Sequence, residues 1–456
     1  MKRQIFEALW ALRRRVPVPR RADVVPASRP ADLTAEPNWP ALTRHDGDEA
    51  FGYGYIARLR DSAQVLIAAA GPDGTGLRIH SHDAPATPEA THPHVVVDAA
   101  NLVIDFARIG RRDDLRHRLG YLPSKNGYLD YREGALIGFE AKEIEWPCEE
   151  RFPRDHMRAI FDGMQIVDRQ PNVHRIVDEP VLFISREPRE NGNLFHAVTD
   201  WLSAFSACRM LDLDPREVTV ALMDGNAPTG VDDGWKALFP GRPVDRLGAW
   251  GAAAVLFRRA IFPSPGYSSF LYSDLMSDVP ETLAPVGLLG DFAASIAGGF
   301  GIRSQPRNAQ EPLRVTLVAR RPGARVPALR QFRHEQALAA AIGAAVGGEV
   351  AVHDFAALSL RDQVDVVSAT DILVGAHGAA LTHLLFLPRH GVAVEVVARP
   401  ARATYRLFPH MATWSGHRLL RVEAEETFSL SGTFLEPNQG ELSSAMVEAV
   451  GLIAAG

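Results

Sequence analysis

The sequence predicts an α/β protein with two parallel sheets of the Rossmann type and a mixed amino-terminal appendage. From residue 181 onward, short β-branched runs alternate with longer helical segments, which is typical of βαβ units. A chain of 456 residues, of which 46% are hydrophobic, is too long for one core and has enough apolar residues for two. We therefore expect an appendage at residues 1–175, an amino-terminal Rossmann-like domain at 176–305 and a carboxyl-terminal one at 306–456.

Composition excludes several classes of protein. The formal net charge of -6 argues against a nucleic-acid binder that depends on overall positive charge. The two cysteines, Cys148 and Cys208, allow at most one disulfide and exclude a cysteine-built zinc site. No apolar run reaches the roughly 18 residues of a membrane-spanning helix. We expect a cytoplasmic protein that binds no nucleic acid.

The first fifteen residues are basic and partly apolar. Lys2, Arg3 and residues 13–15 supply the charge around an interrupted apolar stretch, so a helix here would suit a membrane surface. A frayed or docking terminal helix explains the same pattern and is the simpler interpretation. No small-residue cleavage site follows, so a secretory signal is not predicted. Peripheral membrane contact through this segment is therefore an alternative expectation.

The remaining elements follow in chain order. Residues 17–50 are rich in Pro, Asp and Ala and indicate a linker, whereas residues 53–70 have strand-like character. The first sheet is expected to take strands near residues 181–184, 218–223 and 253–257. The second is expected to take strands at 315–319, 349–352, 371–375 and 392–397, with helices over 335–346 and 360–368.

The strongest motif is the segment 375–383, which follows an apolar strand and opens an apolar helix. Its small residues at the turn are Gly375, Gly378 and Ala379. Small side chains let a diphosphate approach backbone N–H groups, and the helix dipole favours negative charge there. His377 would lie at the mouth of the turn and donate to a phosphate oxygen. A tight turn with a helix-capping role is the alternative.

A carboxylate interrupts the next apolar strand. Glu395 lies within residues 392–397, where every other residue is Val or Ala. A buried charge without a partner is costly, so this carboxylate needs a ribose diol, a backbone N–H or an arginine. The sequence leaves the ribose contact and the structural ion pair open.

Arginines cluster after the predicted strand 315–319. Several guanidinium groups together can grip phosphates through bidentate hydrogen bonds and stabilise a leaving diphosphate without a metal. A solvated basic loop is the alternative interpretation. The cluster consists of Arg314, Arg320, Arg321, Arg325, Arg330 and Arg333.

A third motif follows the strand at 181–184. His196 and Asp200 lie four residues apart on one helix face, close after Asn193. A carboxylate that orients an imidazole makes a general base able to deprotonate a hydroxyl. The spacing alone is weak evidence, and a structural role for these residues is the simpler alternative.

Asp212 and Asp214 match the Asp-x-Asp motif with which many sugar transferases bind a metal ion. The pair follows a helical stretch and precedes Pro215, so we interpret it as the end of a helix and predict no bound metal. No His-Glu-x-x-His, Gly-x-Ser-x-Gly or Walker sequence is present.

Together these motifs resemble glycosyltransferase family 61, and within it the EGF-domain-specific O-linked N-acetylglucosamine transferase branch. Residues 368–388 resemble the family's most specific motif, and Asn193 with His196 and Asp200 is similar to its Asn-x-x-His segment. Arg320 with Arg325 resembles its spaced arginine pair. Residues 101–105 and 131–133 resemble segments that precede the catalytic region, and Ala319 departs from the usual Ser.

The resemblance implies a GT-B fold and an inverting reaction without a metal cofactor. It implies a UDP-sugar donor, with N-acetylglucosamine preferred and xylose next, and an acceptor hydroxyl on a glycan or protein. His196 would act as base with Asp200, and Asn193 would lie on the acceptor side. The residues expected to bind the donor are Arg320, Arg321, Arg325, Gly375, His377, Gly378, Ala379, Thr382 and Glu395.

Two further functions stay open. A nucleotide-binding module that has lost turnover would fit the departures around the arginines. A metal-dependent transferase of the GT-A type would use Asp212 and Asp214.

Overall fold

The structure is a computed structural model. It describes residues 52–82, 94–111, 129–143, 160–186, 192–266, 285–303, 307–308, 310–321, 328–399, 406–429 and 432–455. The basic amino terminus, Cys148 and Arg325 lie outside the described residues. None of the helices in the described part of the chain combines the length and the apolar character that crossing a bilayer requires.

The first sheet has a parallel centre that contains the three predicted strands and one further strand, β12. Its order is β12 (Val244–Arg246), β11 (Thr219–Leu222), β10 (Val181–Ile184) and β13 (Ala254–Pro263), and β10 pairs in parallel with both β11 and β13. Counted along the chain this is the order 3-2-1-4 of a Rossmann sheet, with its switch point between β10 and β13. The crossover after β10 is α6 (Leu194–Met210).

The amino-terminal region continues this sheet. β3 (His94–Asp105) pairs antiparallel with β13 along almost its whole length, so the appendage does not merely pack against the core. The strands beyond β3 are β2 (Gly76–His82), β1 (Gln64–Ala69) and β7 (Ala141–Glu143), and shorter strands at its margins are β6 (Leu136–Phe139), β8 (Gln165–Val167) and β9 (Arg175–Val177). A separate ladder joins β4 (Ile109–Arg111) and β5 (Leu129–Tyr131).

The expectation of strand-like structure over residues 53–70 is wrong for its first half. That half is the helix α3 (Tyr53–Asp61), and only the second half is β1. Tyr55, Ile56 and Leu59 are buried and lie at helical spacing, so one apolar face covers the sheet.

The second sheet has the parallel order β16 (Val350–Asp354), β14 (Val315–Ala319), β17 (Ile372–Ala376), β18 (Val392–Ala398) and β19 (Arg418–Ser429). Counted along the chain this is 2-1-3-4-5, a doubly wound order with its switch point between β14 and β17. β20 (Gly432–Pro437) then pairs antiparallel with β19 and parallel with β15 (Ala328–Phe332). The four strands predicted here are confirmed within two residues at each end.

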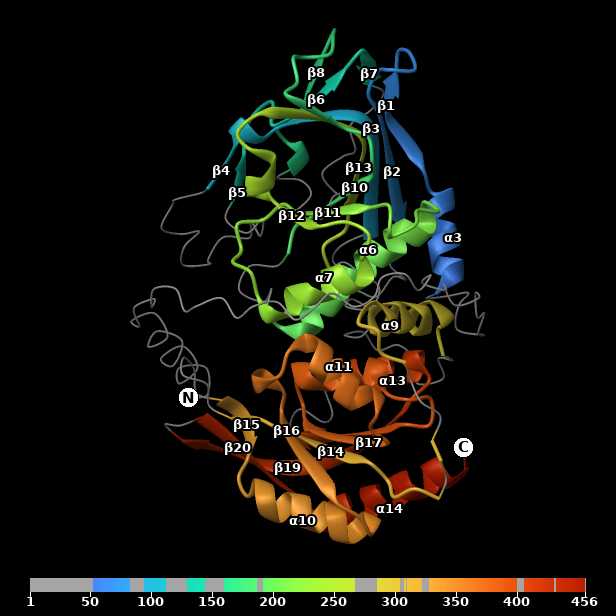
Figure 1. Ribbon diagram of the computed structural model, residues 1–456, viewed down its shortest axis with the longest axis vertical. Coiled ribbons are helices and arrows are strands. Elements are labelled where there is room, and N and C mark those ends of the chain that lie inside the picture. Colours follow the sequence, from blue (N-terminus) through green and yellow to red (C-terminus); the bar gives the residue numbers. More distant parts are fainter. Residues whose placement is uncertain are drawn as a thin grey trace.

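Helices cover both faces of the second sheet (Figure 1). α10 (Glu335–Val346) and α14 (Gln439–Ala455) pack on its outer face, and α11 (Leu360–Ser368) and α13 (Leu407–Ser415) lie on the inner one. The predicted helices at 335–346 and 360–368 are confirmed at both ends. Single turns are η1 (Phe106–Arg108), η2 (Gly230–Asp232), η3 (Leu247–Trp250) and η5 (Phe355–Ala357).

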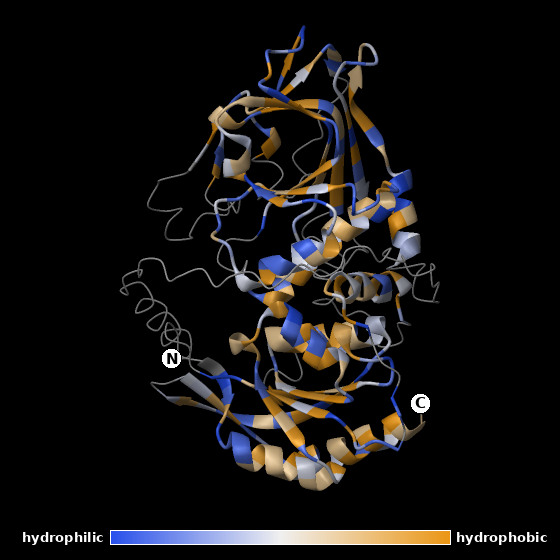
Figure 2. Cartoon of the chain, in the orientation of Figure 1, coloured by the Kyte–Doolittle hydropathy of each residue, from blue (hydrophilic) through white to orange (hydrophobic). Residues whose placement is uncertain are grey.

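One apolar core joins the two sheets. It contains side chains of α6, α7 (Asp233–Leu238) and α9 (Gly287–Gly299) together with side chains of α11, α13 and η6 (Ala379–Phe386). Trp201, Trp235 and Trp414 are fully buried in it. The central strands of both sheets are largely hydrophobic in Figure 2. The sequence therefore predicts the two sheets, and their division into two domains of the GT-B type stays a prediction.

Candidate functional site

The switch point of the second sheet brings two predicted segments together. β14 pairs in parallel with β17 up to Val318 and Gly375, so both strands end at the same edge. Arg320 follows β14, and His377 and Gly378 follow β17. Ligands of open parallel sheets bind outside the carboxyl ends of the strands at such a point.

The Arg320 guanidinium lies directly against Gly378. A Cβ atom at residue 378 would lie 2.3 Å from Arg320 Nη2, and the backbone there has a φ of +148°. Burial of the guanidinium, together with the charge of Arg330, lowers the pKa of Arg320 to about 10. The residue is still a cation at neutral pH. A glycine is therefore required at this turn by both the close approach and the backbone conformation.

Arg330 supplies a second cation to the same turn. Its Nη1 donates to the carbonyl oxygen of His377 at 2.7 Å, and its backbone adopts a left-handed φ of +58° on β15. The sequence placed Arg330 in the arginine cluster but not among the donor-binding residues. The strand that contains Arg330 lies near the end of β17 because β15 pairs with β20. No pattern in the sequence predicts that pairing.

His377 and Glu395 contact each other. His377 Nδ1 lies 2.5 Å from Glu395 Oε1, and Arg421 Nε donates to Glu395 Oε2 at 2.6 Å. The side chain of Glu395 is 1% exposed. Of the two roles that the sequence left open for Glu395, the structure shows the ion pair.

Some backbone N–H groups of the turn already form hydrogen bonds within the protein. The N–H of His377 donates to the Val396 carbonyl, and the N–H of Leu381 donates to the Gly378 carbonyl. The amides of residues 378–380 lie between these two bonds at the start of η6. The predicted apolar helix after the turn is thus a 3₁₀-helix.

The other predicted donor-binding residues lie differently. Arg321 is exposed and pairs with Glu335 at the start of α10 at 2.8 Å. Thr382 is fully buried, and its hydroxyl has no hydrogen-bond partner among the described residues. Gly375 packs within β17 under Leu381, and Ala379 is half-buried beside it. Arg320, His377 and Gly378, together with Glu395 in contact with His377, are the predicted residues that the structure gathers at one point.

The switch point of the first sheet holds the other predicted group. A small cavity there is lined by Ser185 at the end of β10, by Ser264 after β13 and by Asp200. Asp200 is 5% exposed, and its Oδ1 accepts the backbone N–H of Gly266 at 2.7 Å. Asp200 therefore fixes the chain that leaves β13.

Asn193 and His196 occupy the first turns of α6. The Asn193 side chain accepts the N–H of Phe195 at 3.1 Å and so caps the helix, a role that Asn commonly has. His196 is half-buried, and its carbonyl accepts the Thr199 hydroxyl at 2.7 Å. The orientation of His196 by Asp200 stays a prediction.

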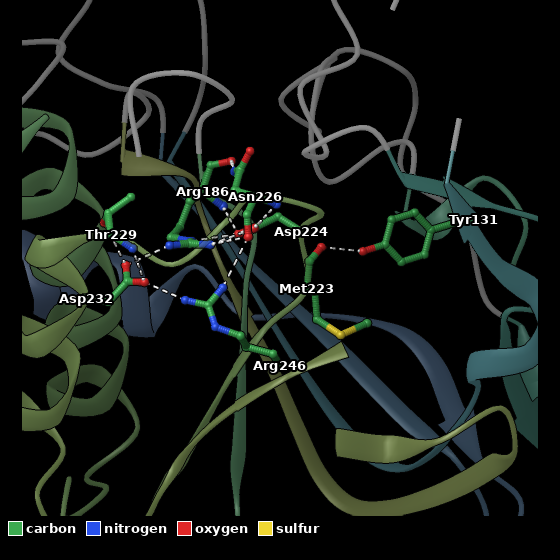
Figure 3. Close-up of polar contacts among 8 residues, drawn as sticks. All are labelled: Tyr131, Arg186, Met223, Asp224, Asn226, Thr229, Asp232 and Arg246. Atoms are coloured by element: carbon green, nitrogen blue, oxygen red, sulfur yellow. Dashed lines mark hydrogen bonds and ion pairs between the residues drawn. The ribbon is translucent and has the colours of Figure 1, made fainter. Parts of the chain in front are cut away.

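A buried charge network frames the carboxyl ends of the first sheet (Figure 3). Arg186, which is 2% exposed, donates to both oxygens of Asp224 at 2.8 and 2.9 Å and to Asp232 at 2.7 Å. Arg246 also pairs with Asp232. The two arginines and the two aspartates of the network therefore have a net charge of zero. The network ties the last residue of β12 to the segments that follow β10 and β11. Sequence reasoning missed it because the partners lie far apart in the chain.

The Asp-x-Asp pair closes a helix, as predicted. α6 ends at Met210, and Asp212 follows in a left-handed backbone conformation with a φ of +53°. Asp212 pairs with Arg60 at 3.3 Å, and Asp214 pairs with Arg216 at 2.6 Å. Each of the two carboxylates is therefore paired with an arginine.

Comparison with known proteins finds a match to one family model. The family model described as Glycosyltransferase 61 matches residues 194–394, from the start of α6 into β18. This range contains His196, Asp200, Arg320, His377 and Gly378.

Curated relatives match a larger part of the chain. It is 26% identical over 312 residues to the beta-1,2-xylosyltransferase of Arabidopsis thaliana, covering 60% of this chain and 57% of that protein. It is 27% and 28% identical, over 311 and 308 residues, to the EGF domain-specific O-linked N-acetylglucosamine transferases of Bos taurus and Rattus norvegicus. These two matches cover 65% of this chain and 55% of each relative. The chain thus spans about half the length of the curated relatives it matches, and its residues 194–394 are similar to the glycosyltransferase 61 family.

Proposed function

We propose that this protein is a glycosyltransferase that moves a sugar from a UDP-sugar to a hydroxyl group on a glycan or protein. The family domain supports the class of reaction. The names of the relatives support both xylose and N-acetylglucosamine as the transferred sugar, and we keep N-acetylglucosamine as the preferred one and xylose as the next. The observation that carries the proposal is the meeting of Arg320 and Arg330 at the turn that holds Gly378.

The charges of this site favour a diphosphate. Arg320 and Arg330 are like charges held close enough for one to lower the pKa of the other. The neighbouring carboxylate, Glu395, is already paired with Arg421, so it does not cancel them. Placing a diphosphate between two guanidiniums relieves their repulsion and forms charge-assisted hydrogen bonds. The same contacts would stabilise the diphosphate as it leaves, which is the task a metal performs in other transferases.

The acceptor would approach from the first sheet. α6 and η6, which follow the switch-point strands of the two sheets, pack against each other and share one core. In the proposed reaction, His196 takes the proton of the acceptor hydroxyl, and Asp200 holds the neighbouring chain in place. The oxygen attacks the anomeric carbon opposite the departing diphosphate, so the configuration inverts. Exclusion of water would limit hydrolysis of the donor.

The test is sugar transfer and donor hydrolysis from UDP-N-acetylglucosamine and UDP-xylose, measured in EDTA. We expect turnover of one donor, and its loss in Arg320→Ala, in Arg330→Ala and in His196→Ala. Arg321→Ala is the matched control, because that side chain forms a surface pair with Glu335. Full activity of Arg320→Ala would refute the proposed donor site. UDP binding without turnover would favour the silent binding module, and activity abolished by EDTA would favour a metal-dependent enzyme.

A further inference from the structure

Three side chains form a line across the second sheet at its ligand-binding edge. The strand register pairs Gly375 with Glu395, and Glu395 with Arg421. Alternate residues of a strand share a face, and His377 comes two residues after Gly375. The register thus brings His377, Glu395 and Arg421 into contact on one side of the sheet.

Each oxygen of the central carboxylate has its own partner. Oε1 of Glu395 meets His377 Nδ1 at 2.5 Å, and Oε2 accepts from Arg421 Nε at 2.6 Å. Arg421 neutralises a carboxylate that is almost completely buried, which makes its burial tolerable. The carboxylate in turn fixes one edge of the imidazole.

The contact between Nδ1 and Glu395 determines the orientation of the His377 ring. With Nδ1 directed at the carboxylate, Nε2 is the nitrogen left for the diphosphate, and it donates to a phosphate oxygen when the ring is an imidazolium, which carries a proton on both nitrogens. Phe408 packs edge to face against the ring, with centroids 5.2 Å apart. The ring therefore has a carboxylate on one edge and an aromatic contact beside it, next to the turn that carries Gly378.

We infer that Glu395 and Arg421 are positioning residues that orient His377 toward the donor diphosphate. The inference rests on the proposed function. It assigns Glu395 a task other than binding ribose, since both of its oxygens contact protein groups.

A carboxylate, an arginine and a histidine also meet at the opposite end of the sheet. Asp371 precedes β17, is fully buried, and pairs with Arg314 at 2.8 Å and with His390 at 2.7 Å. This second triad lies at the amino ends of the strands, away from the edge where ligands bind. It provides a matched control, because its carboxylate is as buried and as fully paired as Glu395.

The experiment compares Glu395→Gln, Asp371→Asn and His377→Ala by calorimetry with UDP and with uridine. We expect Glu395→Gln to weaken UDP binding by about tenfold, the effect of one charge-assisted hydrogen bond, and to leave uridine binding unchanged. Asp371→Asn should lower thermal stability and leave UDP affinity intact. In a double-mutant cycle, Glu395→Gln should have no further effect once His377 is alanine.

Additive losses in that cycle would overturn the inference, because Glu395 would then act without His377. Equal loss of UDP and uridine affinity in Glu395→Gln would also overturn it and would indicate a ribose contact. Failure of the wild-type chain to bind UDP would refute the proposed function itself. Normal UDP binding by both the wild type and Glu395→Gln would refute only the positioning role.

Discussion

Replacing Gly378 by alanine tests the close approach at the switch point. The new methyl group would lie 2.3 Å from Arg320 Nη2 and 3.0 Å from Arg320 Cζ, so the guanidinium must move. The backbone φ of +148° adds strain for any residue with a Cβ, on the order of 1–3 kcal/mol. The variant should therefore be less stable, and its Arg320 guanidinium should be displaced from the turn.

The expected loss of affinity follows from the contact removed. A hydrogen bond to a charged group contributes roughly 1.5–3 kcal/mol. Its loss corresponds to UDP binding that is about 10- to 150-fold weaker. Uridine, which carries no phosphate, should bind as it does to the wild type.

Calorimetry with UDP and uridine, together with thermal unfolding, measures both effects. Gly347→Ala is the control, because that glycine has a φ of +69° at the end of α10 but open space around its missing side chain. It should lose stability without losing UDP affinity. A folded Gly378→Ala protein that binds UDP as tightly as the wild type would refute the reasoning.

Other predictions concern stability and turnover. Arg186→Met should lose about 3–5 kcal/mol of unfolding free energy in urea, because it strands a buried carboxylate; a loss below 1 kcal/mol would contradict this. Burial lowers the pKa of His383 and of His417 to about 4, so stability should be complete above pH ~6.5 and fall toward pH 4 by about 1.4 kcal/mol per unit for each residue. Denaturant midpoints that stay constant over this range would exclude it. Gly266→Ala should reduce kcat but spare UDP affinity, since its Cβ would lie 2.6 Å from Asp200 Oδ1; an unchanged kcat would count against this role.

Local patterns predicted the elements of the second sheet well. The helix at 335–346 begins at an acidic first turn and ends at Gly347, whose left-handed conformation stops it. The strand at 392–397 is a run of Val and Ala that suits a sheet covered on both faces. Such signals lie within one segment, and tertiary contacts did not override them.

Contacts between distant segments could not be predicted. The pairing of β3 with β13 joins residues about 160 positions apart, and nothing in either strand specifies the other. Arg330 reaches the turn at His377 only through the edge strand β15. The sequence could show that Glu395 needed a partner, but the parallel register that supplies Arg421 is a property of the folded sheet.

The most direct test of the central claim is the affinity of the chain for UDP compared with uridine, in EDTA, for the wild type and for Arg320→Ala. We predict that the wild type binds UDP far more tightly than uridine, and that Arg320→Ala loses most of this difference while its affinity for uridine stays the same. Equal binding of UDP and uridine by the wild type, or an unchanged difference in Arg320→Ala, would contradict a diphosphate site between β14 and β17.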